Sequence, residues 1–279
     1  MSSPEINVSE PAPRLGTTAS PEAAARSDGS FWRNKWTLRV ISWLILLAIW
    51  QIVAIWRGPF FVPTLQAVVF DGLPEVFSAG YSEIFLNSWA QLFLGFFVAC
   101  AIAIPLGALM GRFRAVNAFL SPYANSLFVT PSAALLPLII LLAGTDLQYR
   151  VVVVVLFAFF YPLVGTAAGV RYVEGTYTET GRAFCLSRLQ FTTKILLPAS
   201  APFIVEGVRL GLGMAVQGML VAELWVSGGT GQLLSGLSER RELDTYFALA
   251  ALVVALSLVL MHLLRRLEDR LPGSTRLEL

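Results

Sequence analysis

The sequence predicts an all-α integral membrane protein with six transmembrane helices. Three observations lead to this prediction. Of the 279 residues, 56% are hydrophobic and only 14% are charged, whereas a soluble domain has about 25% charged residues. The apolar residues form six blocks of about 20 residues or more, the length that crosses a bilayer. Basic residues are shared unequally between alternate connections. We therefore expect a transmembrane domain over 31–270, between cytoplasmic tails at 1–30 and 271–279.

The chain is expected to enter the membrane after a disordered tail. Its first 30 residues are rich in Ser, Pro, Ala and Glu without periodicity, which is typical of disorder. An aromatic and basic girdle at 31–36 is typical of a membrane interface and precedes the first span, about Thr37 to Trp56. The connection from Gly58 to Glu83 is too polar to cross. It is predicted to hold a short amphipathic helix with Thr64 as N-cap.

The next three spans differ in how they are interrupted. The second, about Leu86 to Met110, ends with two glycines four residues apart, a spacing that lets a neighbouring helix approach closely. The third, about Phe119 to Ala143, holds three prolines and several polar residues, including Thr130 and Ser132. Because prolines free backbone carbonyls that need partners, we expect this span to face the interior of an assembly. The fourth span is about Tyr149 to Val170.

A polar segment at 174–198 separates the fourth and fifth spans. It is basic but keeps a regular apolar set, which a merely solvated loop would not need. We expect a helix near Tyr177 to Phe184, and a second helix opened by Ser187, whose hydroxyl begins a Ser-x-x-Gln capping box. The bend lies near Cys185, and Pro198 is expected to break the backbone before the fifth span.

The fifth span, about Ala199 to Ala222, is the most polar. Charges inside a span are rare and usually face protein or water. Glu206 and Arg209 are three residues apart, so they are predicted to form a structural intramembrane pair on one helical face.

An even number of spans places both termini on one side of the membrane. The sixth span is about Tyr246 to Leu264. Under this topology fifteen of the 20 Lys and Arg residues lie on the side of the termini and four on the other. Since basic residues favour the cytoplasmic face, the termini and the 174–198 segment are expected to be cytoplasmic.

The 174–198 segment resembles the EAA loop of ATP-binding-cassette (ABC) importer permeases, whose pattern is roughly E-A-A, three residues, G, about a dozen residues, then L-P. Glu179 matches the Glu, Thr180 and Gly181 stand at the alanines, and Pro198 closes the L-P. Cys185 stands where the glycine would be. Because a left-handed backbone disfavours Cys, we expect an ordinary backbone region at this bend. The coupling residues implied by the resemblance are Glu179, Thr180, Gly181, Arg182, Ala183, Cys185, Ser187 and Pro198.

The resemblance extends over the spans and is greatest to the nitrate, sulfonate, taurine and bicarbonate branch. It implies a type I importer permease fold in a bacterial inner membrane, and transport of a small anionic solute. The implied partners are a second permease copy, two ATP-binding subunits that hold ATP and Mg, an extracytoplasmic binding protein and membrane lipid, with no nucleic acid. Solute contacts are predicted at Thr130, Ser132, Gln217 and Glu223.

Several other functions are less well supported. Neither lysine, Lys35 or Lys194, has the P-loop context that ATP hydrolysis requires, so no catalytic residue is expected. One histidine and two separate cysteines predict no metal site and no cofactor. An ion-gradient-driven secondary transporter is the alternative, but it would need inverted repeats and midplane carboxylates. A basic segment that meets only lipid headgroups and a non-transporting scaffold are the remaining alternatives.

Overall fold

The structure, a computed structural model, describes residues 35–58, 60–226 and 228–268. Every regular element among these residues is a helix. The chain divides into two compact units, residues 1–52 and 53–279, and the boundary lies inside α1 (Lys35–Arg57). The predicted tails at 1–30 and 271–279 lie outside the described residues and stay predictions.

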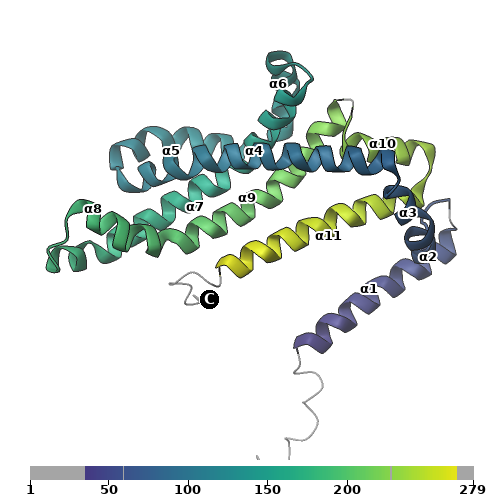
Figure 1. Ribbon diagram of the computed structural model, residues 1–279, viewed down its shortest axis with the longest axis horizontal. Coiled ribbons are helices and arrows are strands. Elements are labelled where there is room, and N and C mark those ends of the chain that lie inside the picture. The colour runs from purple at the N-terminus through teal and green to yellow at the C-terminus, as the bar shows by residue number, and fades with distance from the viewer. Residues whose placement is uncertain (1–34, 59, 227, 269–279) are drawn as a thin grey trace, which may run out of the picture. The chain divides into compact units, whose positions relative to one another are not determined.

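The elements after α1 are shown in Figure 1. They are α2 (Leu65–Ala67), the π-helical turn η2 (Val68–Gly72), α3 (Leu73–Val76), α4 (Ala79–Arg112), α5 (Arg114–Val129), the 3₁₀ turn η3 (Ser132–Leu135), α6 (Leu136–Ala143), α7 (Leu147–Ala183), α8 (Arg188–Phe191), the π-helical turn η4 (Thr192–Leu196), α9 (Leu197–Trp225), α10 (Thr230–Arg240) and α11 (Leu243–Glu268).

Among the described residues, five helical stretches are long and apolar enough to cross a membrane, and there are six if one bent pair is counted as a single span. The pair is α5 with η3 and α6, which meet at an angle of 94°. Pro131 explains the break, because proline lacks an N–H and pushes the preceding residue into extended backbone. Thr130 has ψ 131°, as this rule requires. The third span is therefore two helices, where the sequence had predicted one stretch interrupted by prolines.

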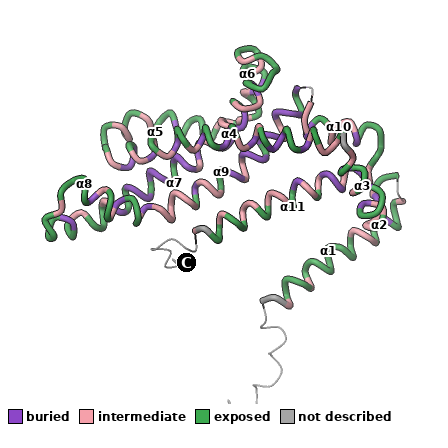
Figure 2. The backbone as a smooth tube through the Cα atoms, in the orientation of Figure 1, coloured by how far each residue is buried: buried purple, intermediate pink, exposed green. Residues whose placement is uncertain are grey.

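The core within residues 53–279 lies where α4, α7 and α9 pack along one another (Figure 1). Glycines make this approach possible. A Cβ on Gly107 of α4 would lie 2.5 Å from the carbonyl oxygen of Leu163 on α7, and one on Gly207 of α9 would lie 2.8 Å from that of Tyr161. Buried residues follow the facing sides of these helices, and exposed apolar residues face outward (Figure 2). Apolar residues on both the buried and the exposed faces are expected for helices surrounded by lipid.

The connection before the second span contains the predicted short helix. Thr64 is its N-cap, and the backbone N–H of Ala67 donates to Thr64 Oγ1 at 3.3 Å. Val68 and Val76 of this connection are buried, and η2 and α3 pack against α11. The predicted short helix with Thr64 as its N-cap is confirmed.

Candidate functional site

The first arm of the 174–198 segment is the end of α7. This helix runs without interruption from the fourth span to Ala183. A Schellman motif then closes it: the N–H of Leu186 donates to the Gly181 carbonyl at 3.0 Å, and the N–H of Cys185 donates to the Arg182 carbonyl at 2.9 Å. Such a closure requires a left-handed residue at its turning point.

Cys185 occupies that turning point with φ 50°. The sequence prediction of an ordinary backbone region at this residue is therefore wrong. Two hydrogen bonds satisfy carbonyls that the helix end would leave without partners, and they outweigh a cost of roughly 1–2 kcal/mol for a left-handed L-residue. The bend thus has the left-handed backbone that favours glycine, although the residue is Cys.

The second arm begins with the predicted capping box. The N–H of Gln190 donates to Ser187 Oγ at 3.3 Å, and the N–H of Ser187 donates to Gln190 Oε1 at 3.0 Å. From Arg188 the chain stays helical through η4 into α9, so Pro198 breaks nothing. Proline is tolerated in a first helical turn, and here it follows a π-helical turn that leads into α9. The predicted break at Pro198 is wrong for this reason.

The two arms pack against each other through Gly181 and Phe191. A Cβ on Gly181 would lie only 2.6 Å from Phe191 Cδ2. The Phe191 ring belongs to a buried cluster with Val170, Val173 and Leu196. Both arms are thereby fixed to their spans, and the angle between them is set by a close contact.

The outer surface of the segment carries most of the predicted coupling residues. Glu179, Thr180, Arg182, Ala183, Cys185, Ser187 and Pro198 are exposed, and only Gly181 is buried. Large apolar side chains are exposed beside them, with Phe184 at 74% and Leu189 at 73%. The structure thus places a mixed apolar and charged surface on a rigid bend.

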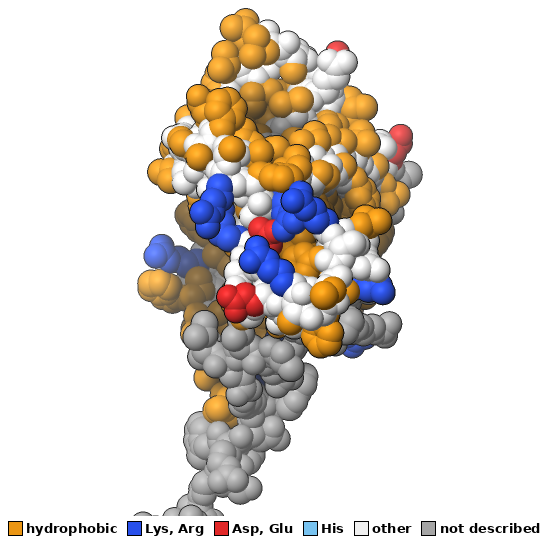
Figure 3. Space-filling model, turned by 90° about the vertical axis from the view of Figure 1, so that its left-hand side faces the viewer, with side chains coloured by type: hydrophobic (Ala, Val, Ile, Leu, Met, Phe, Trp, Pro, Cys, Tyr) orange, Lys and Arg blue, Asp and Glu red, His pale blue; other side chains and the backbone are white. Residues whose placement is uncertain are grey.

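A cavity of about 830 Å³ lies on the inner side of the bend. Figure 3 shows Lys and Arg side chains gathered on this end of the molecule, below a mainly hydrophobic surface. The cavity is lined by five arginines and one carboxylate, and we call it the arginine cavity. These residues are Arg112, Arg114, Arg171, Arg182, Arg188 and Glu174.

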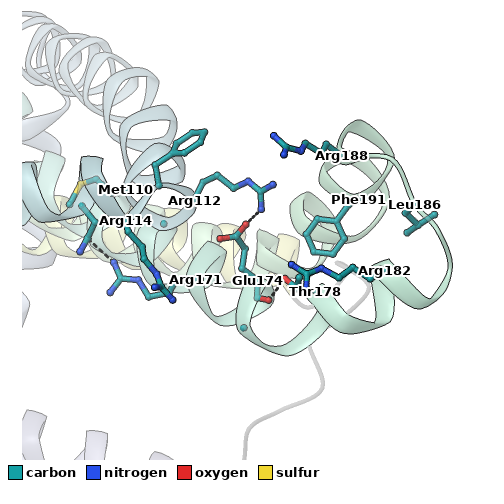
Figure 4. Close-up of a pocket in the computed structure, with 15 residues that line it drawn as sticks. Met110, Arg112, Arg114, Arg171, Glu174, Thr178, Arg182, Leu186, Arg188 and Phe191 are labelled. Carbon is teal, nitrogen blue, oxygen red and sulfur yellow. Dashed lines mark hydrogen bonds and ion pairs between the residues drawn. The ribbon is translucent and has the colours of Figure 1, made fainter.

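Two of these arginines have fixed partners. Arg112 forms an ion pair with Glu174, and Arg171 donates to Asn117 Oδ1 at 2.6 Å. Arg112 from α4 and Arg188 from α8 reach toward each other from opposite sides (Figure 4). From the sequence, Arg182 was predicted as a coupling residue, and the other four arginines of the cavity contributed only to the predicted orientation. The convergence of the five arginines from four helices, α4, α5, α7 and α8, has no local signal in the sequence.

The predicted solute contacts lie in two places. Thr130 and Ser132 flank the break between α5 and η3, and Thr130 Oγ1 donates to the Ser126 carbonyl at 2.8 Å. Gln217 is exposed on α9, whereas Glu223 on the same helix is 1% exposed. Among the described residues, no hydrogen bond or ion pair links the four side chains to one another, and their role stays a prediction.

The predicted intramembrane pair has a different partner. Arg209 Nε lies 3.8 Å from Glu268 Oε2 at the end of α11, while Glu206 is exposed. The pairing of Glu206 with Arg209 is therefore corrected to Arg209 with Glu268. Helical spacing alone favoured the local pair, but the packing of α9 against α11 supplies a carboxylate on the buried side.

Residues 103–272 match the family described as binding-protein-dependent transport system inner membrane component. The chain belongs to this family. A membrane permease of an ABC importer uses ATP hydrolysed on a separate subunit, so the bent segment and its cavity belong to a transporter and not to an enzyme.

Similar permeases occur in bacteria and archaea. A probable ABC transporter permease protein of Brucella melitensis is 31% identical over 66% of this chain and 75% of its own. The taurine transport system permease protein TauC of Escherichia coli is 28% identical over 84% of this chain and 88% of its own. A putative ABC transporter permease protein of Methanocaldococcus jannaschii is 29% identical over 81% of this chain and 87% of its own.

Two solved structures share the fold. The crystal structure of an amino acid ABC transporter with histidines has a TM-score of 0.57 at 20% identity, over 72% of this permease and 99% of that chain. The MetNI methionine ABC transporter in an inward facing conformation has a TM-score of 0.55 at 21% identity, over 69% of this permease and 96% of that chain. These similarities confirm the predicted permease fold.

Proposed function

We propose that this permease works as one of two copies in an importer for a small anionic solute, and that an ATP-binding subunit docks on the outer surface of its 174–198 segment, which we call the coupling segment. One observation carries the docking proposal. The coupling segment exposes Phe184 and Leu189 beside charged Glu179 on a bend fixed by a Schellman motif and a capping box. Exposed apolar side chains on a rigid element are typical of a binding surface.

The connection of this surface to the spans supports a mechanical role. The arm before the bend is the end of α7, and the arm after it continues into α9. Both helices pack along their lengths. A displacement of the coupling segment would therefore move two spans together, as in a rigid-body switch between two states.

The solute class is inferred from relatives. Permeases named for taurine, aliphatic sulfonates and bicarbonate are 28–30% identical to this chain, and all three solutes carry an acidic group. Hydroxyl donors at Thr130 and Ser132, beside a helix break, suit an anion. We infer that an extracytoplasmic binding protein delivers the solute, and that a second copy completes the path because the described residues of one chain form at most six spans.

The charge distribution supports a cytoplasmic coupling segment. Its end of the molecule carries the arginine cavity, which holds Arg112, Arg114 and Arg171, as well as Arg182 and Arg188 of the segment itself. Basic residues near the ends of spans favour the cytoplasmic side. ATP-binding subunits act on that side.

The test is a charge reversal on the docking surface. Glu179→Lys, reconstituted in proteoliposomes with the ATP-binding subunit and the binding protein, is expected to lower ATP-driven uptake roughly tenfold or more, because like charges across an interface oppose association. Glu239→Lys is the matched control, since Glu239 is also exposed but lies on α10. Unchanged uptake by Glu179→Lys would contradict the docking proposal.

Transport driven by an ion gradient is the other possibility. The family match favours ATP. Uptake that follows an imposed ion gradient without ATP or its hydrolysing subunit would favour the secondary transporter instead.

A further inference from the structure

The arginine cavity has more positive charge than its surroundings neutralise. Its single carboxylate, Glu174, is taken by Arg112. Among the described residues, the other four arginines of the cavity form no ion pair. Positive charges that line one cavity repel each other, so an anion bound in the cavity would relieve the repulsion. Arginine guanidinium groups bind phosphate in a bidentate manner.

An apolar groove of about 400 Å³ adjoins the cavity. It lies between α4, α5 and α7, and every lining side chain is apolar except for the hydroxyl of Tyr123. Met110 lines both the groove and the arginine cavity. The basic recess and the apolar groove are therefore neighbours along α4, with the buried Met110 between them.

The order of residues along α4 and α5 shows where the arginine cavity and the apolar groove lie along the spans. On α4, Ile102, Leu106 and Met110 line the groove at intervals of four residues, and Arg112 follows in the cavity. On α5 the order is reversed: Arg114 and Asn117 line the cavity, and residues from Leu120 onward line the groove. The charged part thus lies at the ends of the spans and the apolar part inside them.

We propose that the cavity and groove together bind one anionic phospholipid, with its phosphate among the arginines and an acyl chain along the groove. Basic pockets at span ends bind acidic lipid headgroups, and a groove lined by apolar side chains suits a hydrocarbon chain and not a free anion. This inference depends on the membrane setting that the family match establishes. It is tested separately from the docking proposal, because Arg114 and Arg171 of the cavity lie outside the coupling segment.

The inference is tested by lipid retention on the full-length permease purified without other subunits. Phosphatidylglycerol and phosphatidylcholine with the same acyl chains are titrated in detergent, and bound lipid is counted by native mass spectrometry. Phosphatidylglycerol is expected to bind about tenfold more tightly. The variant Arg114→Gln/Arg171→Gln is expected to lose about tenfold or more in that affinity, because each arginine near an acidic headgroup contributes a factor of about five.

The matched control removes two positive charges from the same end of the molecule without touching the cavity. Lys194 and Arg265 are exposed and do not line it, so Lys194→Gln/Arg265→Gln is expected to change affinity less than twofold. Leu127→Trp fills the groove at a residue that is 44% exposed. It is expected to weaken lipid binding with all arginines in place.

Three results would overturn the inference. Equal affinity for both lipids would exclude headgroup recognition. Complete displacement of phosphatidylglycerol by millimolar inorganic phosphate, with no effect of Leu127→Trp, would assign the cavity to a free anion. Efficient disulfide formation between two copies carrying Leu127→Cys would show that a second permease covers the groove. The docking variant Glu179→Lys is expected to bind lipid normally, so failure of one proposal is distinguishable from failure of the other.

Discussion

The backbone N–H of Gly231 donates a 2.8 Å hydrogen bond to Oε2 of Glu223, whose side chain is 1% exposed. The atoms around the glycines of this turn leave no room for a side chain at either position. A Cβ on Gly229 would lie 2.3 Å from Glu223 Cδ, and one on Gly231 would lie 2.5 Å from the Leu220 carbonyl oxygen. Nearby, the Thr230 N–H donates to Ser88 Oγ at 2.9 Å. One buried carboxylate and one serine thus fasten the start of α10 to α9 and α4.

Glu223→Ala is expected to lower the free energy of unfolding by about 2 kcal/mol, because it removes the acceptor and leaves the Gly231 N–H buried without a partner. The measurement is thermal unfolding of the purified permease in detergent. Gln217→Ala, at an exposed residue of the same helix, is expected to change stability by less than about 0.5 kcal/mol. If Glu223 only contacted solute, its removal would impair uptake and leave stability unchanged.

Gly181→Val is expected to push α8 away from α7, because its Cβ would meet the buried Phe191 ring. Overpacking of this kind costs about 1–3 kcal/mol. ATP-driven uptake should fall as well, since the angle of the coupling segment changes. Gly175→Val on the same helix has open space around it and serves as the control. Equal uptake by the two variants would show that the angle of the bend has no role in transport.

Substitutions of Cys185 measure the cost of its left-handed backbone. Cys185→Gly is expected to stabilise the permease by about 0.5–1 kcal/mol. The relief of about 1–2 kcal/mol of backbone strain exceeds the free-energy cost of the higher conformational entropy that glycine gives the unfolded chain. Cys185→Ala should be nearly neutral, and Cys185→Val should destabilise because a branched Cβ worsens the strain. Thermal unfolding of the three variants gives this order. A stability gain in Cys185→Ala equal to that in Cys185→Gly would assign the effect to the thiol.

Gly107→Ala is expected to destabilise the contact between α4 and α7 by about 1–3 kcal/mol. The new Cβ would lie 2.5 Å from the Leu163 carbonyl oxygen, and backbone cannot move aside as a side chain can. Gly80→Ala, also on α4 but with nothing within 4 Å, should be neutral or slightly stabilising. Retained thermal stability in Gly107→Ala would mean that the two helices separate at little cost.

The spans and the caps could be predicted because their signals are local. The length of an apolar block determines whether it can cross a bilayer. Thr64 and Ser187 cap helices through residues only three positions away. These features need no knowledge of the rest of the fold.

The remaining features depend on contacts between distant segments. The left-handed backbone of Cys185 follows from two closing hydrogen bonds, which outweigh its intrinsic preference. Arg209 pairs with Glu268, which is distant in the sequence, because α11 packs on α9. The three prolines of the third span indicated an interruption, but the 94° angle at Thr130 is a property of the folded chain. The arginine cavity likewise exists only where α4, α5, α7 and α8 meet.

The unbroken length of α7 has a mechanical consequence. Its 37 residues extend about 55 Å at 1.5 Å per residue, nearly twice the hydrocarbon thickness of about 30 Å. A tilt of about 10° at one end would carry the other end about 10 Å sideways over that length. If a nucleotide-driven subunit docks on the coupling segment as proposed, α7 would act as a lever arm, so that small rotations within the span correspond to larger displacements at the bend.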